Sequence, residues 1–192
     1  MVSRETLISQ FFPGREDEIL HYAQFLATAG IERGLIGPQE ADRIWERHIF
    51  NSLPVISLIP PGASLFDIGS GAGLPGIPIA LARPDLVVTL IEPLARRVDF
   101  LKEAVLGLDI ALLHGRAQDF TMKADFVTAR AVAPLEKLKA MSWHLLKVGG
   151  SLLAIKGENA SQEILGVNRA ELHEIQIEGL PLGRVISLRK TG

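Results

Sequence analysis

The feature that most constrains this chain is the segment from Leu65 to Gly76, which reads Leu-Phe-Asp-Ile-Gly-Ser-Gly-Ala-Gly-Leu-Pro-Gly. A short apolar run that contains Asp67 is followed by glycines at three alternate positions and then by Pro75. Glycine lacks a Cβ atom and adopts positive φ at little cost, so such a turn lets a ligand lie against the backbone. Proline suits a first helical turn, where free N–H groups face that ligand. The segment therefore predicts a strand, a cofactor-binding turn and a helix that opens at Pro75.

Two cofactors compete for this turn. The pattern Gly71-x-Gly73-x-x-Gly76 fits the dinucleotide fingerprint, whose pyrophosphate lies on a helix N-terminus. The pattern Asp67-x-Gly69-x-Gly71-x-Gly73 fits the S-adenosylmethionine (SAM) loop of Rossmann-like methyltransferases. An acid at Asp67 would repel a pyrophosphate, whereas it could contact the ammonium group of a methionine moiety directly or through water. The sign of this charge favours SAM, and a nucleotide-dependent oxidoreductase remains the alternative.

Composition limits the other classes of protein. With 192 residues and 47% hydrophobic content, the chain suits one domain with a small appendage and a substantial core. It contains no cysteine and five scattered histidines, so we expect neither disulfides nor a metal site. Because it shows no signal-peptide core and no long apolar run, we expect a cytoplasmic protein without a membrane partner. The net charge of −2 means that RNA contact would need a local basic patch.

The first 62 residues show helical periodicity. Apolar side chains fall on one face of a predicted helix from Glu16 to Ala29, and a second helix is predicted from Pro38 to Ile49. Gly62, after two prolines, marks the join to the rest of the chain. We therefore expect an N-terminal helical cap over residues 1–62 and a SAM-binding methyltransferase domain over residues 63–192, which together form effectively one globular unit.

After residue 63, short apolar runs alternate with helical segments, a pattern typical of an α/β fold with a mostly parallel sheet and right-handed crossovers. Seven strands are predicted, as the methyltransferase sheet requires: Ser64–Ile68, Val87–Glu92, Ile110–His114, Phe126–Ala129, Ser151–Lys156, Glu174–Ile177 and Val185–Arg189.

Two charged residues end predicted strands where such folds bind ligands. Glu92 lies nineteen residues after Gly73, at the position where a carboxylate can accept hydrogen bonds from both ribose hydroxyls of an adenosine. Arg130 follows an apolar run of small residues, and a cation in that setting requires a partner. It could hold a carboxylate of the cofactor, a nucleotide phosphate or a guanine edge. We favour a functional role for Arg130 over a structural ion pair.

Several motifs together resemble the RsmG (GidB) family, over a region from about residue 16 to Lys190. The motifs are Arg47–Leu53, Phe66–Pro78, Arg96-Arg97-x-x-Phe100-Leu101, Thr128-x-Arg130-Ala131 and Lys156-Gly157. Members of that family transfer a methyl group from SAM to N7 of a guanosine in small-subunit (16S) ribosomal RNA. The chain departs from the family pattern at Asn51 and around Gly34-Leu35-Ile36, so the contacts made by the cap are not carried over.

The resemblance implies a Rossmann-like SAM-dependent methyltransferase fold and a set of site residues. Glycines of the turn would cradle SAM, Glu92 would bind its ribose, Ala117 and Gln118 would flank adenine, and Arg130 would be the catalytic residue. The whole cofactor-binding set would be Asp67, Gly69, Gly71, Gly73, Leu74, Glu92, Ala117, Gln118 and Arg130. The candidate RNA-binding residues are Arg96, Arg97 and Lys156, although Arg96 and Arg97 are equally consistent with plain surface charge.

Methyl transfer to guanine N7 is consistent with the lack of cysteine and of a predicted metal site in this chain. N7 of guanine carries a free lone pair at neutral pH, so attack on the sulfonium methyl needs alignment more than a general base or a metal. We expect the RNA substrate to be presented by a ribosomal particle or its precursor and the enzyme to act as a monomer. A non-catalytic RNA-binding module is the remaining alternative, and it would bind RNA without binding SAM.

Overall fold

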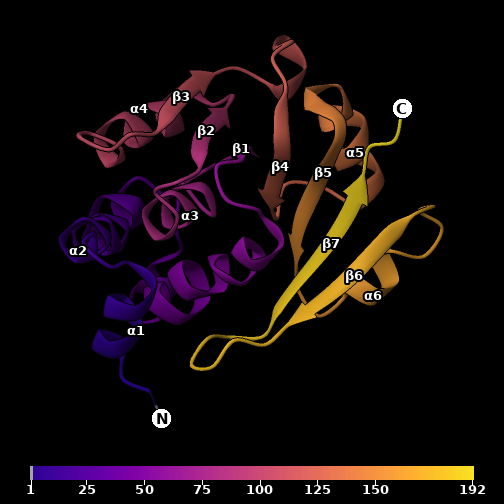
Figure 1. The fold of residues 1–192 in the computed structure, drawn as a ribbon. Helices are drawn as coiled ribbons and strands as arrows, with labels where there is room; N and C mark the ends of the chain where they lie inside the picture. The colour runs from indigo at the N-terminus through magenta and orange to yellow at the C-terminus, as the bar shows by residue number, and fades with distance from the viewer. Residues whose placement is uncertain (1) are drawn as a thin grey trace.

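The structure is a computed structural model that describes residues 2–192, and it is built around one seven-stranded sheet (Figure 1). The strand order is β3-β2-β1-β4-β5-β7-β6. The first five strands pair in parallel, whereas β7 runs antiparallel to both β5 and β6. The strands are β1 (Ser64–Ile68), β2 (Val87–Glu92), β3 (Ala111–His114), β4 (Ala124–Arg130), β5 (Leu146–Lys156), β6 (Ala170–Ile175) and β7 (Gly183–Arg189). The predicted seven-stranded, mostly parallel sheet is confirmed.

The strand bounds were predicted best for β1 and β2, whereas β5, predicted to begin at Ser151, begins at Leu146. The bounds of β1 and β2 agree with the sequence prediction at both ends, because both run through the core as continuous apolar segments. The prediction of β6 as Glu174–Ile177 was wrong, since the strand begins at Ala170. This strand lies at the sheet edge and is only partly buried along its length, so it lacks the apolar run that marks a central strand.

Helices connect the parallel strands on both faces of the sheet. They are α3 (Gly76–Ala82), α4 (Ala95–Ala104), α5 (Leu135–Ser142) and the short α6 (Ala160–Glu163). The predicted helix start was wrong by one residue, because Pro75 is the N-cap of α3 and the helix begins at Gly76. The prediction followed the preference of proline for the first helical turn, whereas Pro75 here ends the turn that precedes it.

The N-terminal residues form helical segments as predicted, although their types differ. The segments are α1 (Arg4–Phe11), α2 (Glu16–Phe25), η1 (Leu26–Gly30), η2 (Pro38–Arg43), η3 (Ile44–Ile49), η4 (Phe50–Ser52) and η5 (Pro54–Leu58). The first predicted helix continues past Phe25 as a π-helix, η1. The second predicted helix is divided into a 3-10 segment and a π-helix at Arg43, where φ is −114° and ψ is 9°. Such a backbone conformation lies outside the helical region and interrupts the helix.

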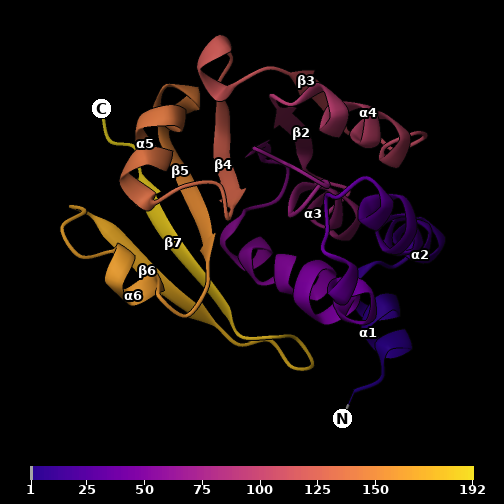
Figure 2. The same ribbon diagram turned by 180° about the vertical axis from the view of Figure 1, so that it is seen from behind.

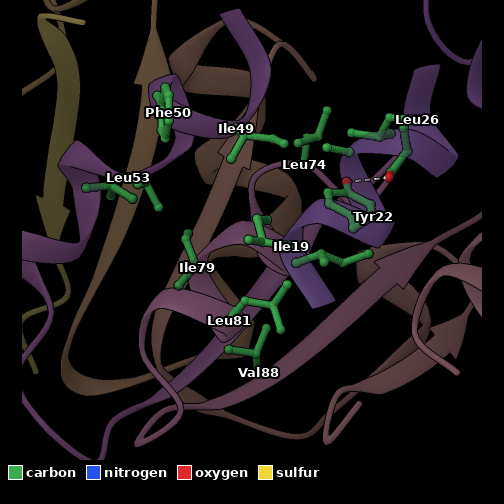
Figure 3. Packing of buried hydrophobic residues seen from close by; sticks show 14 of the residues in the cluster. Ile19, Tyr22, Leu26, Ile49, Phe50, Leu53, Leu74, Ile79, Leu81 and Val88 are labelled. Atoms are coloured by element: carbon green, nitrogen blue, oxygen red, sulfur yellow. Dashed lines mark hydrogen bonds between the residues drawn. The ribbon is translucent and has the colours of Figure 1, made fainter. Parts of the chain in front are cut away.

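The cap packs directly onto the seven-stranded sheet and its helices. Tyr22, on α2, lies among Ile19, Leu26 and Leu74 (Figure 3), in a cluster that also includes residues of β1, α3 and β2. Tyr22 is 1% exposed, and its hydroxyl donates a hydrogen bond to the carbonyl of Ala72 at 2.8 Å. The buried hydroxyl group of Tyr22 therefore links the cap to the glycine-rich turn by a hydrogen bond.

The loop between β6 and β7 also reaches the cap, as both ribbon views indicate (Figures 1 and 2). The backbone of Gly179 lies against Leu7 of α1, and the backbone of Gly183 lies against Pro54 of η5. The loop near the C-terminus thus packs on two N-terminal segments, α1 and η5. Among residues 2–192, no helix combines the length and the apolar composition that crossing a lipid bilayer requires.

Candidate active site

The glycine-rich turn joins β1 to α3 with a backbone that other residues would strain. Gly69, Gly71 and Gly73 all have positive φ, at 67°, 60° and 95°. A Cβ atom on Gly69 would lie 2.9 Å from Cγ2 of Val132, and one on Gly73 would collide with Ile77. Gly69 and Gly73 therefore require glycine for two reasons, the sign of φ and the lack of space, whereas Gly71 requires it for the sign of φ alone.

Asp67 lies beneath this turn and is fully buried. Its Oδ2 atom accepts a hydrogen bond from the backbone N–H of Gly76 at 3.0 Å, while its Oδ1 atom is buried without a partner. Burial raises the pKa of Asp67 to about 7, although the hydrogen bond from Gly76 and the positive charge of Arg130 oppose the shift. The carboxyl group thus supports the start of α3. Contact between Asp67 and the ammonium group of SAM stays a prediction.

Glu92 ends β2 and is also fully buried. Its Oε2 atom accepts a hydrogen bond from the N–H of Gly71 at 2.9 Å, and its Oε1 atom accepts one from Leu94 at 3.0 Å. Arg97 lies close to it, with Nη1 at 3.8 Å from Oε2. Because each carboxylate oxygen can accept two hydrogen bonds, Glu92 keeps acceptor capacity for ribose hydroxyls. It ties the turn to the adjacent strand and faces the cavity described next.

A cavity of about 580 Å³ lies over the glycine turn. Its walls come from the turn, from the start of α4, from the end of β4 and from the cap. The lining includes Leu35, Ile36, Gly37, Glu40, His48, Gly69, Ser70, Gly71, Ala72, Leu74, Glu92, Arg97 and Arg130. Gly69, Gly71, Leu74, Glu92 and Arg130 of the predicted cofactor set therefore share one cavity, whereas Gly73 and Asp67 support its floor.

A second cavity, of about 330 Å³, extends the first toward β3. The two share Gly69, Pro93 and Val132, and the second contains both Ala117 and Gln118. Apolar side chains dominate its lining, so its walls suit the faces of a purine. The full lining is Ile68, Gly69, Ile91, Pro93, Gly115, Arg116, Ala117, Gln118, Val132, Lys137 and Met141. Together the two cavities fit an adenosine joined to an amino acid.

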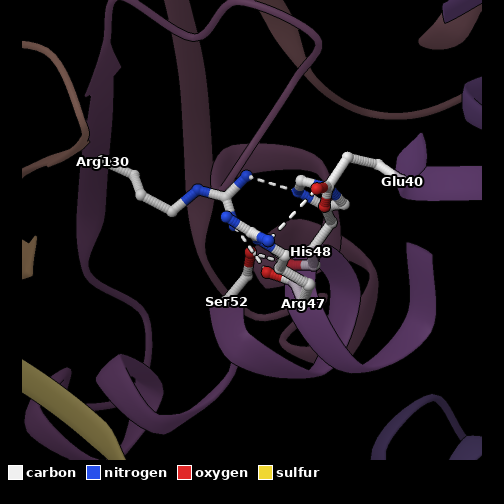
Figure 4. Close-up of polar contacts among 5 residues, drawn as sticks. All are labelled: Glu40, Arg47, His48, Ser52 and Arg130. Carbon is white, nitrogen blue, oxygen red and sulfur yellow. Dashed lines mark hydrogen bonds and ion pairs between the residues drawn. The ribbon is translucent and has the colours of Figure 1, made fainter. Parts of the chain in front are cut away.

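Arg130, at the end of β4, lines the first cavity and contacts the cap directly (Figure 4). Its Nη1 atom donates to the carbonyl of Arg47 at 3.3 Å, and its Nη2 atom lies 3.3 Å from Nδ1 of His48. Among residues 2–192, no carboxylate forms an ion pair with Arg130. Burial lowers the pKa of Arg130 below the ordinary arginine value. The sequence predicted that this cation needs a partner. Within the part of the chain that the structure describes, the groups that accept its hydrogen bonds belong to the cap and are not carboxylates.

A third cavity, of about 630 Å³, lies on the other side of Arg130. It shares His48, Arg130, Ala131 and Val132 with the cofactor cavity, so these residues form the boundary between the two spaces. The complete lining is Arg47, His48, Asn51, Arg130, Ala131, Val132, Ala133, Pro134, Ile155, Lys156, Gly157 and Glu163. The arrangement places two adjoining chambers at the carboxyl ends of parallel strands, as open α/β folds do for their ligands.

The three candidate RNA-binding residues lie in different surroundings. Arg96 is exposed on α4, whereas Arg97 is half-buried beside Glu92 in the wall of the cofactor cavity. The Lys156 side chain is only 9% exposed, with Nζ at 2.6 Å from Oε2 of Glu163 and donating to the carbonyl of Ala133 at 2.9 Å. The structure thus does not bring the three together into one basic patch.

The comparison with known families covers most of the chain. The family described as "GidB: rRNA small subunit methyltransferase G" matches residues 15–180. The chain belongs to this family. A GidB relative from Mycolicibacterium smegmatis, named ribosomal RNA small subunit methyltransferase G, is 57% identical over 150 residues. The match covers 74% of this chain and 64% of that relative, so the chain spans just under two thirds of the relative's length.

Solved structures agree on the fold. The ribosomal protein L11 methylase from Lactobacillus delbrueckii subsp. bulgaricus has a TM-score of 0.57 at 19% identity, covering 73% of this chain and 77% of its own. TYW2 from M. jannaschii, solved in complex with AdoMet (SAM), has a TM-score of 0.53 at 18% identity, covering 75% of each chain. These findings confirm the predicted family and the predicted Rossmann-like fold.

Sequence reasoning missed two residues of this GidB site. His48 lines both large cavities, and Glu40 lines the cofactor cavity, with its Oε2 atom 3.1 Å from Nε2 of His48. His48 belonged to a motif of the resemblance, but nothing in its sequence spacing to Arg130 indicates contact. In the sequence alone, Glu40 resembled an acidic residue on the solvent-exposed face of a helix. Only the packing of the cap against the sheet reveals their role.

Proposed function

We propose that this chain transfers a methyl group from SAM to N7 of a guanosine in small-subunit ribosomal RNA. The observation that carries the proposal is the position of Arg130, at the boundary between the first cavity, which suits SAM, and the third cavity, which would receive a nucleobase. Family membership supports the same substrate class.

The reaction needs little from the protein beyond positioning. Bound SAM supplies an electrophilic methyl group, and the lone pair of guanine N7 forms the new bond while the electrons of the sulfur–methyl bond return to sulfur. Because N7 is unprotonated at neutral pH, no general base is required. Holding the two reactants in line can supply several kcal/mol of the barrier, on the order estimated for oriented reactants. The target base must leave its stack to enter the pocket.

Arg130 would orient the guanine base from the boundary. Its guanidinium group can donate to O6 of guanine, which lies on the same edge as N7. It cannot donate to N7 itself, because that hydrogen bond would occupy the attacking lone pair. In the cofactor cavity, Glu92 would bind the ribose, Ala117 and Gln118 would flank adenine, and the glycine turn with Leu74 would hold the methionine moiety.

The remaining parts of the proposal concern the setting. We propose that the chain acts as a cytoplasmic monomer, with residues 1–62 as a cap on the methyltransferase domain of residues 63–192. Its net charge of −2 gives no general attraction to RNA, so a ribosomal particle or its precursor would present the target. A short isolated RNA that is methylated as fast as the particle would contradict this part.

Radiolabelled methyl transfer from SAM to undermethylated small ribosomal subunits tests the proposed activity. Mass spectrometry of the labelled nucleoside should identify 7-methylguanosine, and Glu92→Ala and Arg130→Ala should each remove most of the label. Glu171→Ala, which changes an exposed acid with a side chain 77% exposed on β6, is the matched control and should leave the label unchanged. SAM binding without label would move the substrate elsewhere, and stabilisation by NAD alone would restore the oxidoreductase hypothesis.

A further inference from the structure

A chain of four side chains links the cap to Arg130 (Figure 4). Arg47 Nη1 lies 3.1 Å from Oε1 of Glu40, and the other carboxylate oxygen of Glu40 lies 3.1 Å from Nε2 of His48. The second ring nitrogen, Nδ1, lies 3.3 Å from Nη2 of Arg130. The contacts join η2, η3 and β4, three elements that are separated in the sequence.

Hydrogen-bonding capacity fixes the state of His48 in this chain. Every nitrogen of a guanidinium group can only donate, so the contact with Arg130 requires Nδ1 of His48 to accept. The ring is then neutral and carries its proton on Nε2, which donates to Glu40. A carboxylate that holds one imidazole nitrogen in this way sets both the tautomer and the orientation of the ring.

The backbone of the same segment reinforces the contact. Arg130 also donates to the carbonyl of Arg47, and the Ser52 hydroxyl donates to the carbonyl of His48 at 2.7 Å. Nη1 of Arg130 also donates to the carbonyl of His48 at 3.5 Å, so three N–H groups of Arg130 are engaged by the cap, and those left on Nη2 and Nε can serve the adjoining cavities. Side chains of both positioning residues are largely buried, with His48 15% and Glu40 21% exposed.

We propose that Glu40 and His48 are positioning residues that hold the guanidinium group of Arg130 toward the guanosine, and that they do so only while His48 is neutral. This inference rests on the proposed function. Protonation of His48 would place an N–H group against the guanidinium donor and remove the acceptor on which the orientation of Arg130 depends.

The charges around His48 favour its neutral form. Arg130 from β4 and Arg47 from η3 lower the pKa of His48, as does burial, which is the largest cause. Glu40 from η2 acts in the opposite direction. Methyl transfer should therefore fall as the pH drops below the ordinary histidine range, where His48 gains its proton.

Three substitutions separate positioning from mere structure. His48→Leu removes the acceptor, and it should lower kcat at least about tenfold, the loss expected for a hydrogen bond to a charged group. The affinity for SAM, measured by calorimetry, should change less than about twofold, because the glycine turn and Glu92 are untouched. His48→Asn keeps an acceptor near the position of Nδ1 but cannot be protonated. It should restore most of kcat and remove the decline of activity at acidic pH.

Glu40→Gln should retain more activity than Glu40→Ala, because the amide oxygen still accepts from Nε2 of His48. Glu46→Ala is the control, since Glu46 lies on the same element as His48 and forms only an exposed pair with Arg4. It should leave kcat and the pH profile unchanged. Full activity in His48→Leu, or an Asn variant that loses as much as the Leu variant and keeps the acidic decline, would overturn the proposal.

A measurement without turnover separates this proposal from the proposed function. In nitrogen-15 NMR spectra, the imidazole of His48 should be neutral with its proton on Nε2 at neutral pH, and Arg130→Met should raise its pKa. A protonated ring, or a proton on Nδ1, would refute the arrangement even in a protein that methylates RNA. The expected spectrum in a protein that methylates no guanosine would refute the proposed function alone.

Discussion

The glycine turn and the Arg130 cluster lie on opposite walls of one cavity, yet they are built in opposite ways. The turn is a single continuous segment whose glycines adopt positive φ and whose surroundings leave no room for a Cβ atom at Gly69 or Gly73. The Arg130 cluster is assembled from η2, η3 and β4, and Arg130 contacts a residue 82 positions away in the chain. The first wall is specified by local backbone preferences, whereas the second exists only once the cap has packed on the sheet.

This difference predicts which property of the protein a substitution in each wall should affect. A change in the turn acts on backbone conformation and core packing, so it should cost stability and SAM binding together. A change in the Arg130 cluster alters partly exposed side chains, so it should cost catalysis with little loss of stability. The following predictions test that contrast.

The largest effect is expected from Gly76→Ala, at the first residue of α3. A Cβ atom there would overlap Leu90 and lie 2.7 Å from Oδ2 of Asp67. Overpacking of this kind should lower the free energy of unfolding by about 3 kcal/mol and abolish SAM binding, as measured by denaturant unfolding and calorimetry. Gly30→Ala is the matched control, because its Cβ atom would meet its nearest neighbours at an ordinary 3.8 Å. Equal losses of stability in the two variants would contradict the conclusion that the space around Gly76 excludes a Cβ atom.

Asp67 should make the stability of the turn depend on pH. Its folded pKa of about 7 exceeds the ordinary value of 3.8, so the folded state binds more protons than the unfolded state between these limits. The free energy of unfolding should therefore fall as the pH rises through this window, by about 2 kcal/mol between pH 5 and pH 7. Asp67→Asn, which keeps an acceptor for Gly76, should remove this slope in urea unfolding curves. A slope that persists in the Asn variant would show that another group causes it.

Asp67 also offers a test of the predicted contact with SAM. An ammonium group near the carboxylate would lower the pKa of Asp67, so SAM binding near pH 6 should release a proton. Calorimetry in buffers of different ionisation enthalpy measures that release, and Asp67→Asn should eliminate it. Proton release that is unchanged in the variant would remove Asp67 from the contacts of the cofactor.

The smallest effect is expected from Tyr22→Phe, in the hydrogen bond between the cap and the glycine turn. The substitution removes the hydroxyl that donates to Ala72 and leaves that buried carbonyl without its partner. It should lower the free energy of unfolding by about 1 kcal/mol and weaken SAM binding while the pH profile of methyl transfer stays the same. Thr28→Ala, which removes an exposed hydroxyl bonded to the carbonyl of Gln24, is the control. A changed pH profile in Tyr22→Phe would mean that the walls are not independent.

The elements of the fold that the sequence predicted well are those with local causes. Central strands such as β1 and β2 are continuous apolar runs, and their bounds were correct. The edge strand β6 has no such run, and its start was misplaced by four residues. The predicted helix from Pro38 to Ile49 is divided at Arg43, where the backbone leaves the helical region, and side-chain periodicity alone does not register this change.

The sequence by itself determined the glycine turn, the strand-end acid Glu92 and the cation Arg130, because each depends on residue type at a fixed distance from a strand. Only the tertiary structure decided what surrounds them. It placed Asp67 beneath the turn, paired Lys156 with Glu163 and brought Glu40 and His48 to Arg130. The physical reason is that a backbone turn is specified within a few residues, whereas the partner of a buried charge is whichever distant segment the packing brings within hydrogen-bonding distance.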